Sequence, residues 1–162
     1  MPLQSQNGHQ GHQGHQGHQG HQGHQGHGGP DPLAARLDAD AGIEQVAVTV
    51  MAIWRDIDQA LSPIIGERGV AALFNRSLKR AAATHPWLAA GRGAALDAVD
   101  LPALKAALLM QPPAAAAVGG AALFRSFHDL LASLVGVTLT NRLLHAVWAP
   151  TSGDTPVQDR LP

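Results

Sequence analysis

Apolar residues recur at intervals of three and four along most of this chain, and that periodicity restricts the fold to helices. The clearest run is Ile43, Val46, Ala47, Val50, Trp54, Ile57 and Leu61. Such spacing gathers apolar side chains on one face of an α-helix, whereas a half-buried strand needs strict alternation, and no segment alternates. We therefore predict an all-α fold, an antiparallel bundle of about five helices, without a whole-domain repeat.

Capping residues and prolines predict where the first two helices begin and end. Asp38 or Asp40 is expected to cap the first helix. Ser62-Pro63 should break it and start the second, because serine caps well and proline is favoured at the first helical position. The second helix should continue to about Thr84 and stop at His85-Pro86, since the residue before a proline avoids the helical region. Its inward face is Val70, Leu73, Phe74, Ser77 and Leu78.

Residues 86–99 are expected to form a loop that precedes a short third helix. Trp87 and Leu88 should fold back from this loop onto the core. Asp100 is the predicted cap of the third helix, which ends at about Met110 because two prolines follow. Its inward residues are Leu101, Leu104, Leu108 and, less clearly, Leu109.

The fourth helix should begin in the alanine run after Pro113, and a fifth should follow Gly136. Gly119-Gly120 can delay or kink the start of the fourth helix. Thr138 or Thr140 is the expected cap of the fifth. The predicted inward residues of the fourth are Leu123, Phe124, Phe127, Leu130, Leu131 and Leu134, and those of the fifth are Leu139, Leu143, Leu144, Val147 and Trp148.

The N-terminal segment is a low-complexity repeat. Residues 8–25 are six consecutive Gly-His-Gln triplets, and Gly26-His27-Gly28-Gly29-Pro30 closes the run. Glycine at every third position raises backbone entropy, and the triplets contain nothing to bury, so we expect disorder. A disordered tail and linker over 1–37, a helical domain over 38–149 and a loose C-terminal tail over 150–162 are the predicted divisions.

Histidine at every third position of the tail predicts a capacity to bind divalent metal. Neutral imidazole suits zinc, copper and nickel. Neighbouring histidines would stand about 9 Å apart on an extended chain, so chelation needs the glycines to let the chain bend. The candidate ligands are His9, His12, His15, His18, His21, His24 and His27. The tail is similar to the histidine-rich extensions of nickel and zinc storage and chaperone proteins. A triplet expansion of the coding sequence or an appended purification handle would produce the same peptide.

The charge balance excludes a strong field of either sign. Eleven Lys and Arg oppose twelve Asp and Glu, for a net charge of −1 with histidine neutral. Such a chain has no general attraction to nucleic acid or anionic membranes. Cysteine is absent, which excludes thiolate metal sites and cysteine nucleophiles. No apolar run reaches the ~20 residues of a membrane span, and no secretory signal is seen, so we expect a cytoplasmic protein.

Few residues of the helical part suggest chemistry. Arg76, Lys79 and Arg80 fall together near the end of the second helix and could contact an anion or an acidic partner, although they also form an ordinary solvated face beside the helix dipole. His128 and Asp129 are adjacent, so their side chains should diverge on a helix rather than pair. His85, His128 and His145 are interpreted as structural residues. Neither a nucleophile motif nor a phosphate loop is present, and we expect no enzyme and no required cofactor.

Two segments carry a distant resemblance. Residues 61–78, LSPIIGERGVAALFNRSL, and residues 130–144, LLASLVGVTLTNRLL, resemble parts of small helical domains that accompany bacterial two-component and other signalling proteins. The resemblance implies a regulatory module that contacts a protein partner or self-associates. The first hypothesis is therefore a non-enzymatic helical regulatory or interaction protein, for which the resemblance suggests a role in bacterial signalling. The alternative is a metal-buffering or metal-sensing protein that uses the tail to hold nickel, zinc or copper.

Overall fold

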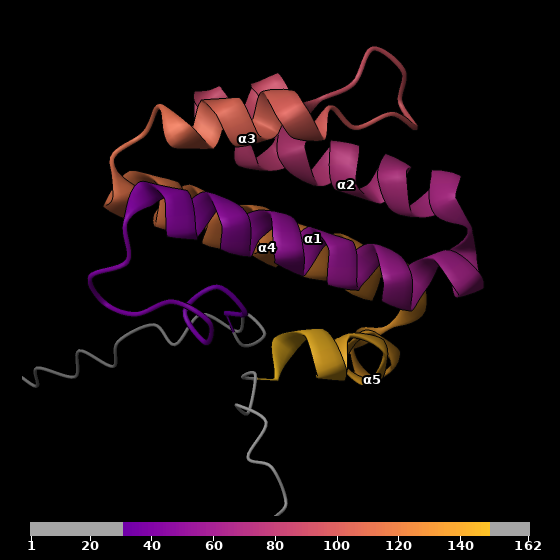
Figure 1. The fold of residues 1–162 in the computed structure, drawn as a ribbon. Coiled ribbons are helices and arrows are strands. Elements are labelled where there is room, and N and C mark those ends of the chain that lie inside the picture. The colour runs from indigo at the N-terminus through magenta and orange to yellow at the C-terminus, as the bar shows by residue number, and fades with distance from the viewer. Residues whose placement is uncertain (1–30, 150–162) are drawn as a thin grey trace, which may run out of the picture.

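The computed structural model describes residues 31–149, which fold as a bundle of helices (Figure 1). The elements are α1 (Ile43–Ile65), α2 (Glu67–Ala81), the 3-10 helix η1 (Pro86–Gly91), α3 (Leu101–Leu109), α4 (Pro113–Val135) and α5 (Val137–Trp148). The described part of the chain has no strand, only an isolated antiparallel bridge between Arg92 and Val99. The prediction of an all-α bundle of about five helices is confirmed.

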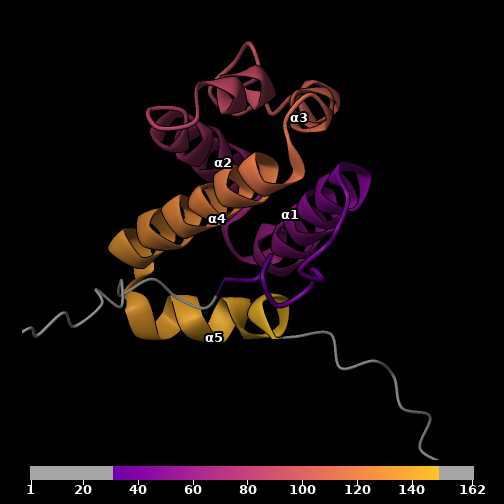
Figure 2. The same cartoon turned by 90° about the vertical axis from the view of Figure 1, so that its left-hand side faces the viewer.

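Two long helices form the centre of the bundle, and each is followed by a shorter helix that turns back. α1 and α4 begin at the same end of the molecule and run in the same general direction (Figures 1 and 2). α2 packs against α4 as well as α1, and α5 packs against α1 as well as α4. If α1–α2 and α4–α5 are taken as two pairs, the short helix of each pair therefore covers the long helix of the other pair. α3 and η1 pack together and cover α1 and α2 on the side opposite α5 (Figure 2).

The core lies where these helices meet, and it is closed by aromatic rings. Trp54 of α1 stacks on Phe74 of α2, with ring centroids 3.6 Å apart and planes 29° apart. Phe127 of α4 approaches both rings edge-on or tilted, at 6.2 and 6.4 Å. These three side chains bury large apolar areas and join three helices, which is how a helical bundle of this size gains most of its stability.

The two helix pairs are copies of one pattern, contrary to the expectation of no repeat. Each α4 position stands 70 residues after its α1 counterpart, from 43 to 113 at the start and from 65 to 135 at the end, and both helices have 23 residues. Both end at a glycine of unusual conformation, Gly66 with φ 80° and ψ 154° and Gly136 with φ 88° and ψ 152°. Only glycine adopts this region without strain, so the same corner is built twice.

The place where the long helices cross supports a two-fold relation between the pairs. A Cβ atom added to Gly120 would lie 3.1 Å from Cγ2 of Val50, the residue that precedes it by 70 positions. A two-fold axis at the crossing would place a residue beside its own counterpart in this way. The repeat is visible in sequence once aligned: 53–66 reads IWRDIDQALSPIIG and 123–136 reads LFRSFHDLLASLVG.

The predicted boundary between the first two helices is wrong. α1 continues through Pro63 to Ile65, and the chain breaks at Gly66 instead. Proline in the final turn removes a single backbone hydrogen bond, and Ser62 donates its hydroxyl to Asp58 Oδ1 at 2.8 Å within the helix rather than capping a new one. The predicted aspartate caps are also wrong, because α1 follows Gly42 without a side-chain cap.

The later helices differ from prediction mainly at their ends. Asp100 caps α3 as expected, its Oδ1 accepting from the Ala103 N–H at 2.9 Å. α5 instead begins directly after Gly136 without a side-chain cap, and Thr140 is buried with its hydroxyl bonded to the Gly136 carbonyl at 2.9 Å. Leu134 and Leu139 were expected to face inward, but they are 67% and 45% exposed, in the last turn of α4 and the first turn of α5, on either side of Gly136.

Gly119 and Gly120 lie inside a continuous helix and serve close packing rather than a kink. A Cβ at Gly119 would come within 2.3 Å of Cζ2 of Trp87, so the indole ring lies directly on the helix backbone. Trp87 is partly buried and Leu88 fully buried, as predicted for residues that fold back onto the core.

Residues 31–37 form a turn that packs on the bundle. Asp31 Oδ1 accepts from the Leu33 N–H at 2.9 Å and from the Ala34 N–H at 3.3 Å, which holds the turn together. Leu33 is 1% exposed. Arg36 donates to Asp56 Oδ2 at 2.8 Å and to the Val147 carbonyl at 2.9 Å, and so ties the turn to α1 and α5.

Candidate functional site

A groove lies along α1 where α3 and α2 meet it, and we name it the Trp54 groove. Its first part has a volume of about 560 Å³ and lies between α1 and α3. Its lining residues are Met51, Trp54, Arg55 and Asp58 of α1 and Leu101, Pro102 and Lys105 of α3. That volume lies within the ~300–1,000 Å³ typical of ligand sites.

The groove continues toward the corner between α1 and α2. This second part has a volume of about 480 Å³ and shares Trp54 and Asp58 with the first. The remaining lining residues are Glu67, Arg68 and Ala71 of α2 and Asp97 and Val99 of the loop before α3. The two parts adjoin at Trp54 and Asp58, which line both of them.

The floor of the groove is rigid and apolar. Trp54 is 6% exposed, and its ring is fixed from beneath by the stack on Phe74 and by the edge of Phe127. Met51 and Leu101 are half-buried beside it. A preformed apolar floor reduces the ordering cost of binding, which favours affinity.

The rim of the groove has opposite charges at its two ends. The α3 end carries the cations Arg55 and Lys105, both exposed, and the Asp58 carboxylate there accepts the Ser62 hydroxyl. The corner end carries Glu67, and Asp97 faces Arg68 at 3.6 Å in a pair whose arginine is 92% exposed. Such an exposed pair contributes little to stability. The groove therefore offers a positive end at α3 and a negative end at the corner.

The corresponding face of α4 has only a small cavity, which we name the Phe124 cavity. Its volume is about 10 Å³, enough for about one water molecule. The lining residues are Ala121, Phe124, Arg125 and His128 of α4, Asp31 and Pro32 of the N-terminal turn, and Trp148 of α5. Its four α4 residues stand 70 positions after Met51, Trp54, Arg55 and Asp58. The two sites are thus counterparts in the repeat.

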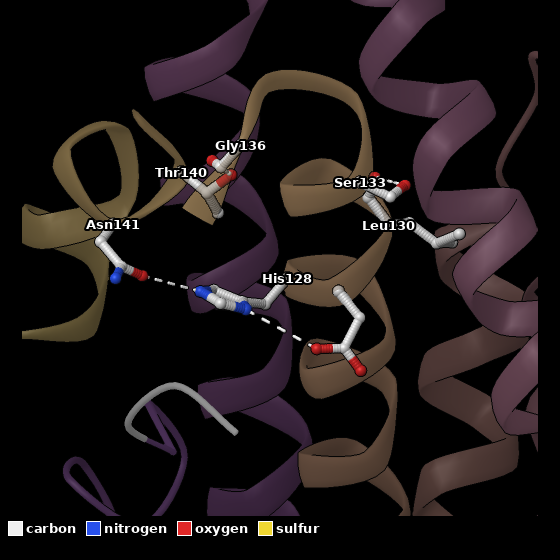
Figure 3. A network of polar contacts seen from close by, with 7 residues as sticks. His128, Leu130, Ser133, Gly136, Thr140 and Asn141 are labelled. Carbon is white, nitrogen blue, oxygen red and sulfur yellow. Dashed lines mark hydrogen bonds and ion pairs between the residues drawn. The ribbon is translucent and has the colours of Figure 1, made fainter. Parts of the chain in front are cut away.

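His128 lies beside the Phe124 cavity in a mostly buried polar contact (Figure 3). Its Nε2 is 2.9 Å from Oδ1 of Asn141 on α5. Nε2 is the donor of this contact in the tautomer that carries its proton there, with the amide oxygen as acceptor. The ring is 6% exposed and lies 6.3 Å from that of Trp148. His128 is thus a mostly buried residue with one ring nitrogen in a polar contact.

Asp129 lies closer to His128 than the sequence predicted. Its Oδ1 is 3.8 Å from His128 Nδ1, although adjacent side chains were expected to diverge (Figure 3). The distance is too long for a hydrogen bond, and His128 Nδ1 and Trp148 Nε1 are buried without a partner in the described structure.

The predicted metal ligands, His9, His12, His15, His18, His21, His24 and His27, lie outside the described residues. Within residues 31–149 no group of three or more His, Cys, Asp or Glu side chains is placed to hold a metal ion. His85 is half-buried with its ring 6.4 Å from Trp87, and His145 is exposed on α5. The structure does not bring these two together with His128.

The other predicted contact residues are separate from the groove. Arg76, Lys79 and Arg80 are exposed near the end of α2, and no ion pair found within the described part of the chain includes them. They keep the form of a solvated basic surface beside the negative end of the helix dipole.

The groove residues were missed by sequence reasoning. Arg55 and Asp58 fall off the apolar stripe of α1 and looked like solvated charges. Nothing local reveals that α3, some fifty residues later, lies across them. The sequence did contain one signal, the repeat. Arg55 and Arg125 occupy the same position in the two copies, and matching apolar residues lie on either side of each.

Comparison with known proteins gives no relative. No protein-family model, curated protein or solved structure matches this chain. Among the described helices, none is both long and apolar enough to cross a lipid bilayer.

Proposed function

We propose that this chain is a non-enzymatic helical interaction module that binds a protein partner along the Trp54 groove. The observation that carries the proposal is the groove itself, about 560 Å³ over a rigid tryptophan floor with two cations on the rim. Aromatic residues and arginine are the side chains most enriched at the energetic centres of protein interfaces. An apolar floor with a charged rim is the arrangement that such interfaces use.

The module has a regulatory role in this proposal. It contributes binding rather than chemistry, and the partner supplies whatever activity is regulated. The resemblance of residues 61–78 and 130–144 to domains that accompany bacterial signalling proteins suggests that signalling is where the partner belongs.

Peptide display against the full chain tests this proposal. A random peptide library is selected on the wild-type protein, and the enriched peptides are then measured on two double variants. Arg55→Glu with Lys105→Glu reverses the charge of the groove rim. Arg76→Glu with Lys79→Glu makes the same change on the exposed basic surface of α2, which is the matched control.

The expected result is a set of peptides that bind the wild type and the α2 variant equally and lose affinity for the groove variant. Peptides that lose affinity only for the α2 variant would move the partner site to Arg76, Lys79 and Arg80. A library that yields no binder at all would contradict the proposal.

A second candidate function rests on the tail. Seven histidines on one short segment give a high local concentration of ligands, so metal buffering or sensing is a proposal that the sequence supports directly. Calorimetric titration with nickel, copper and zinc on the full chain and on a version that begins at Pro30 tests it. Binding is expected in the full chain alone. Equal binding by both versions would exclude the tail as the site.

A further inference from the structure

The corner between α4 and α5 exposes an apolar surface, which we name the Leu134 surface. It consists of Leu134, Val137 and Leu139, which are 67%, 59% and 45% exposed and lie within six consecutive residues around Gly136. α5 lies at the edge of the bundle, which leaves this corner accessible to another molecule (Figure 2). Single apolar residues are ordinary on a protein surface, whereas contiguous ones mark interaction sites.

The repeat provides an internal reference for this surface. The Gly66 corner has the same backbone conformation as the Gly136 corner. The counterparts of the three exposed residues are, in the same order, Ile64, Glu67 and Gly69. The same corner is therefore built once with a charged residue and a glycine and once with Val137 and Leu139. Its geometry does not require the two apolar side chains, so their presence on the surface has another cause.

The charges around the Leu134 surface suit a second copy of the same surface. Residues 130–141 contain no charged side chain, and they are bounded by Asp129 on α4 and Arg142 on α5. The Asp129 side chain is 43% exposed, and Arg142 is exposed and belongs to no ion pair found within residues 31–149. A two-fold axis through the surface would direct Asp129 of each copy toward Arg142 of the other, so that an apolar centre is bordered by two reciprocal ion pairs.

From this self-complementarity we propose that the chain forms a symmetric dimer through the Leu134 surface. The inference goes beyond the proposed function, because the residues that line the Trp54 groove belong to α1, α2, α3 and the loop before α3. One dimer therefore carries two grooves, and a partner with two binding segments would gain affinity from their linkage. Three apolar side chains form an interface smaller than the ~1,200–2,000 Å² of stable complexes, so the dimer is weak and forms as concentration rises.

Sedimentation equilibrium of the full chain tests the proposal over about 10 to 500 µM, the range suited to such a small interface. A chelator is present, so that metal held by the tail histidines does not bridge two chains. The wild type is expected to pass from monomer to dimer. Leu134→Lys should remain monomeric, whereas Ile64→Lys, the same change at the counterpart position, should dimerise as the wild type does. Both side chains are more than half exposed, and circular dichroism checks that both variants keep their helices.

Exchange of the two border charges tests the two-fold pairing itself. Asp129→Lys and Arg142→Glu should each weaken the dimer about tenfold, because a symmetric interface loses two ion pairs and gains two repulsions. The double variant should recover most of the affinity, since the same pairs form again with reversed signs. An effect of Asp129 through its 3.8 Å contact with His128 would not be repaired by the change at Arg142.

Four results would overturn the inference. The wild type could stay monomeric over the whole range, or Leu134→Lys could dimerise as well as the wild type. Ile64→Lys could weaken the dimer as much as Leu134→Lys does, or the double charge variant could fail to regain affinity. A dimer that Arg55→Glu dissolves instead would assign self-association to the Trp54 groove.

Discussion

The faces of α1 and α4 at the Trp54 groove and the Phe124 cavity begin from matching residues and differ in how closely they are covered. Over α4, the N-terminal turn and Trp148 approach until about 10 Å³ remains, while α3 leaves about 560 Å³ over α1. Close packing is the ordinary state of a protein interior, so the closed face follows from stability alone. The open face over α1 is not explained by stability alone. Because the two helices are counterparts in the repeat, this difference singles out α1 as the place to look for a binding site.

The largest expected effect on stability distinguishes the N-terminal turn, which covers α4, from α3, which covers α1. Leu33→Ala should lower the free energy of unfolding by about 3 kcal/mol, because Leu33 is 1% exposed and its loss leaves a cavity at the helix crossing. Leu101→Ala, on the half-buried wall of the groove, should lower it by about 1 kcal/mol or less, because less apolar surface returns to water. Guanidinium unfolding of both variants measures the difference. Equal losses would show that α3 and the turn cover their faces alike.

The corners at Gly66 and Gly136 should lose the same stability on substitution if the two helix pairs are equivalent in energy as well as in geometry. Gly66→Ala and Gly136→Ala should each lower the free energy of unfolding by about 2 kcal/mol, since a side chain at these φ and ψ values is strained. No atom lies within 4 Å of the added Cβ at either position, so strain is the only cost.

The control for the corners is Gly42→Ala. Gly42 has an ordinary φ of −73° and equally open space, so this change should alter stability by about 0.5 kcal/mol or less. Thermal melts of the three variants make the comparison. Costs at the two corners that differ by more than about 1 kcal/mol, the uncertainty expected from context, would break the equivalence of the pairs.

A smaller effect concerns the counterparts Asp58 and His128. Asn141→Ala removes the acceptor of the buried His128 ring and should cost about 1 kcal/mol, because the imidazole N–H loses its partner. Ser62→Ala removes the donor to Asp58, and the cost should be about 0.3 kcal/mol, since that carboxylate is only half-buried and water can replace the hydroxyl. Chemical denaturation at pH 7 distinguishes the two. A larger loss for Ser62→Ala would reverse our view of which polar contact is structural.

The smallest expected effect involves metal. Nickel bound by the tail histidines should change the melting temperature of the bundle by about 1 °C or less, because the ion and the fold do not share residues in this proposal. Binding itself should fall below about pH 6.5, where free imidazole takes up a proton and can no longer ligate. Scanning calorimetry and titration at pH 7.5 and 5.5 check both statements. A large rise in melting temperature that His128→Gln abolishes would place a metal site inside the bundle.

Sequence periodicity was sufficient for the helices and for most of the core. Spacing of three and four identified Val50, Trp54, Phe74 and Phe127 as buried, because one helical face must lie against the others. It was insufficient at the ends, where Leu134 and Leu139 keep the period but are exposed on either side of the Gly136 corner. The spacing of apolar residues within a helix does not predict the direction in which the chain leaves that helix.

The candidate site was beyond local sequence reasoning for a related reason. Its cations, Arg55 and Lys105, come from helices that pack side by side although they are far apart in sequence, and each alone is an ordinary exposed charge. Pairing of helices depends on tertiary packing, which propensity and spacing do not describe. The repeat of residues 53–66 at 123–136 was present in the sequence and, once aligned, makes Arg55 and Arg125 comparable.

The exchange of short helices between the two pairs has a consequence for how the domain comes apart. Because α2 covers α4 and α5 covers α1, neither pair encloses a core by itself. Phe74, for example, stacks on its own pair's Trp54 and also packs toward Phe127 of the other. Loosening one pair exposes the apolar face of both, so the described bundle has no half that can melt first. Its amide protons should share one opening free energy across α1, α2 and α4, as expected for a single cooperative unit.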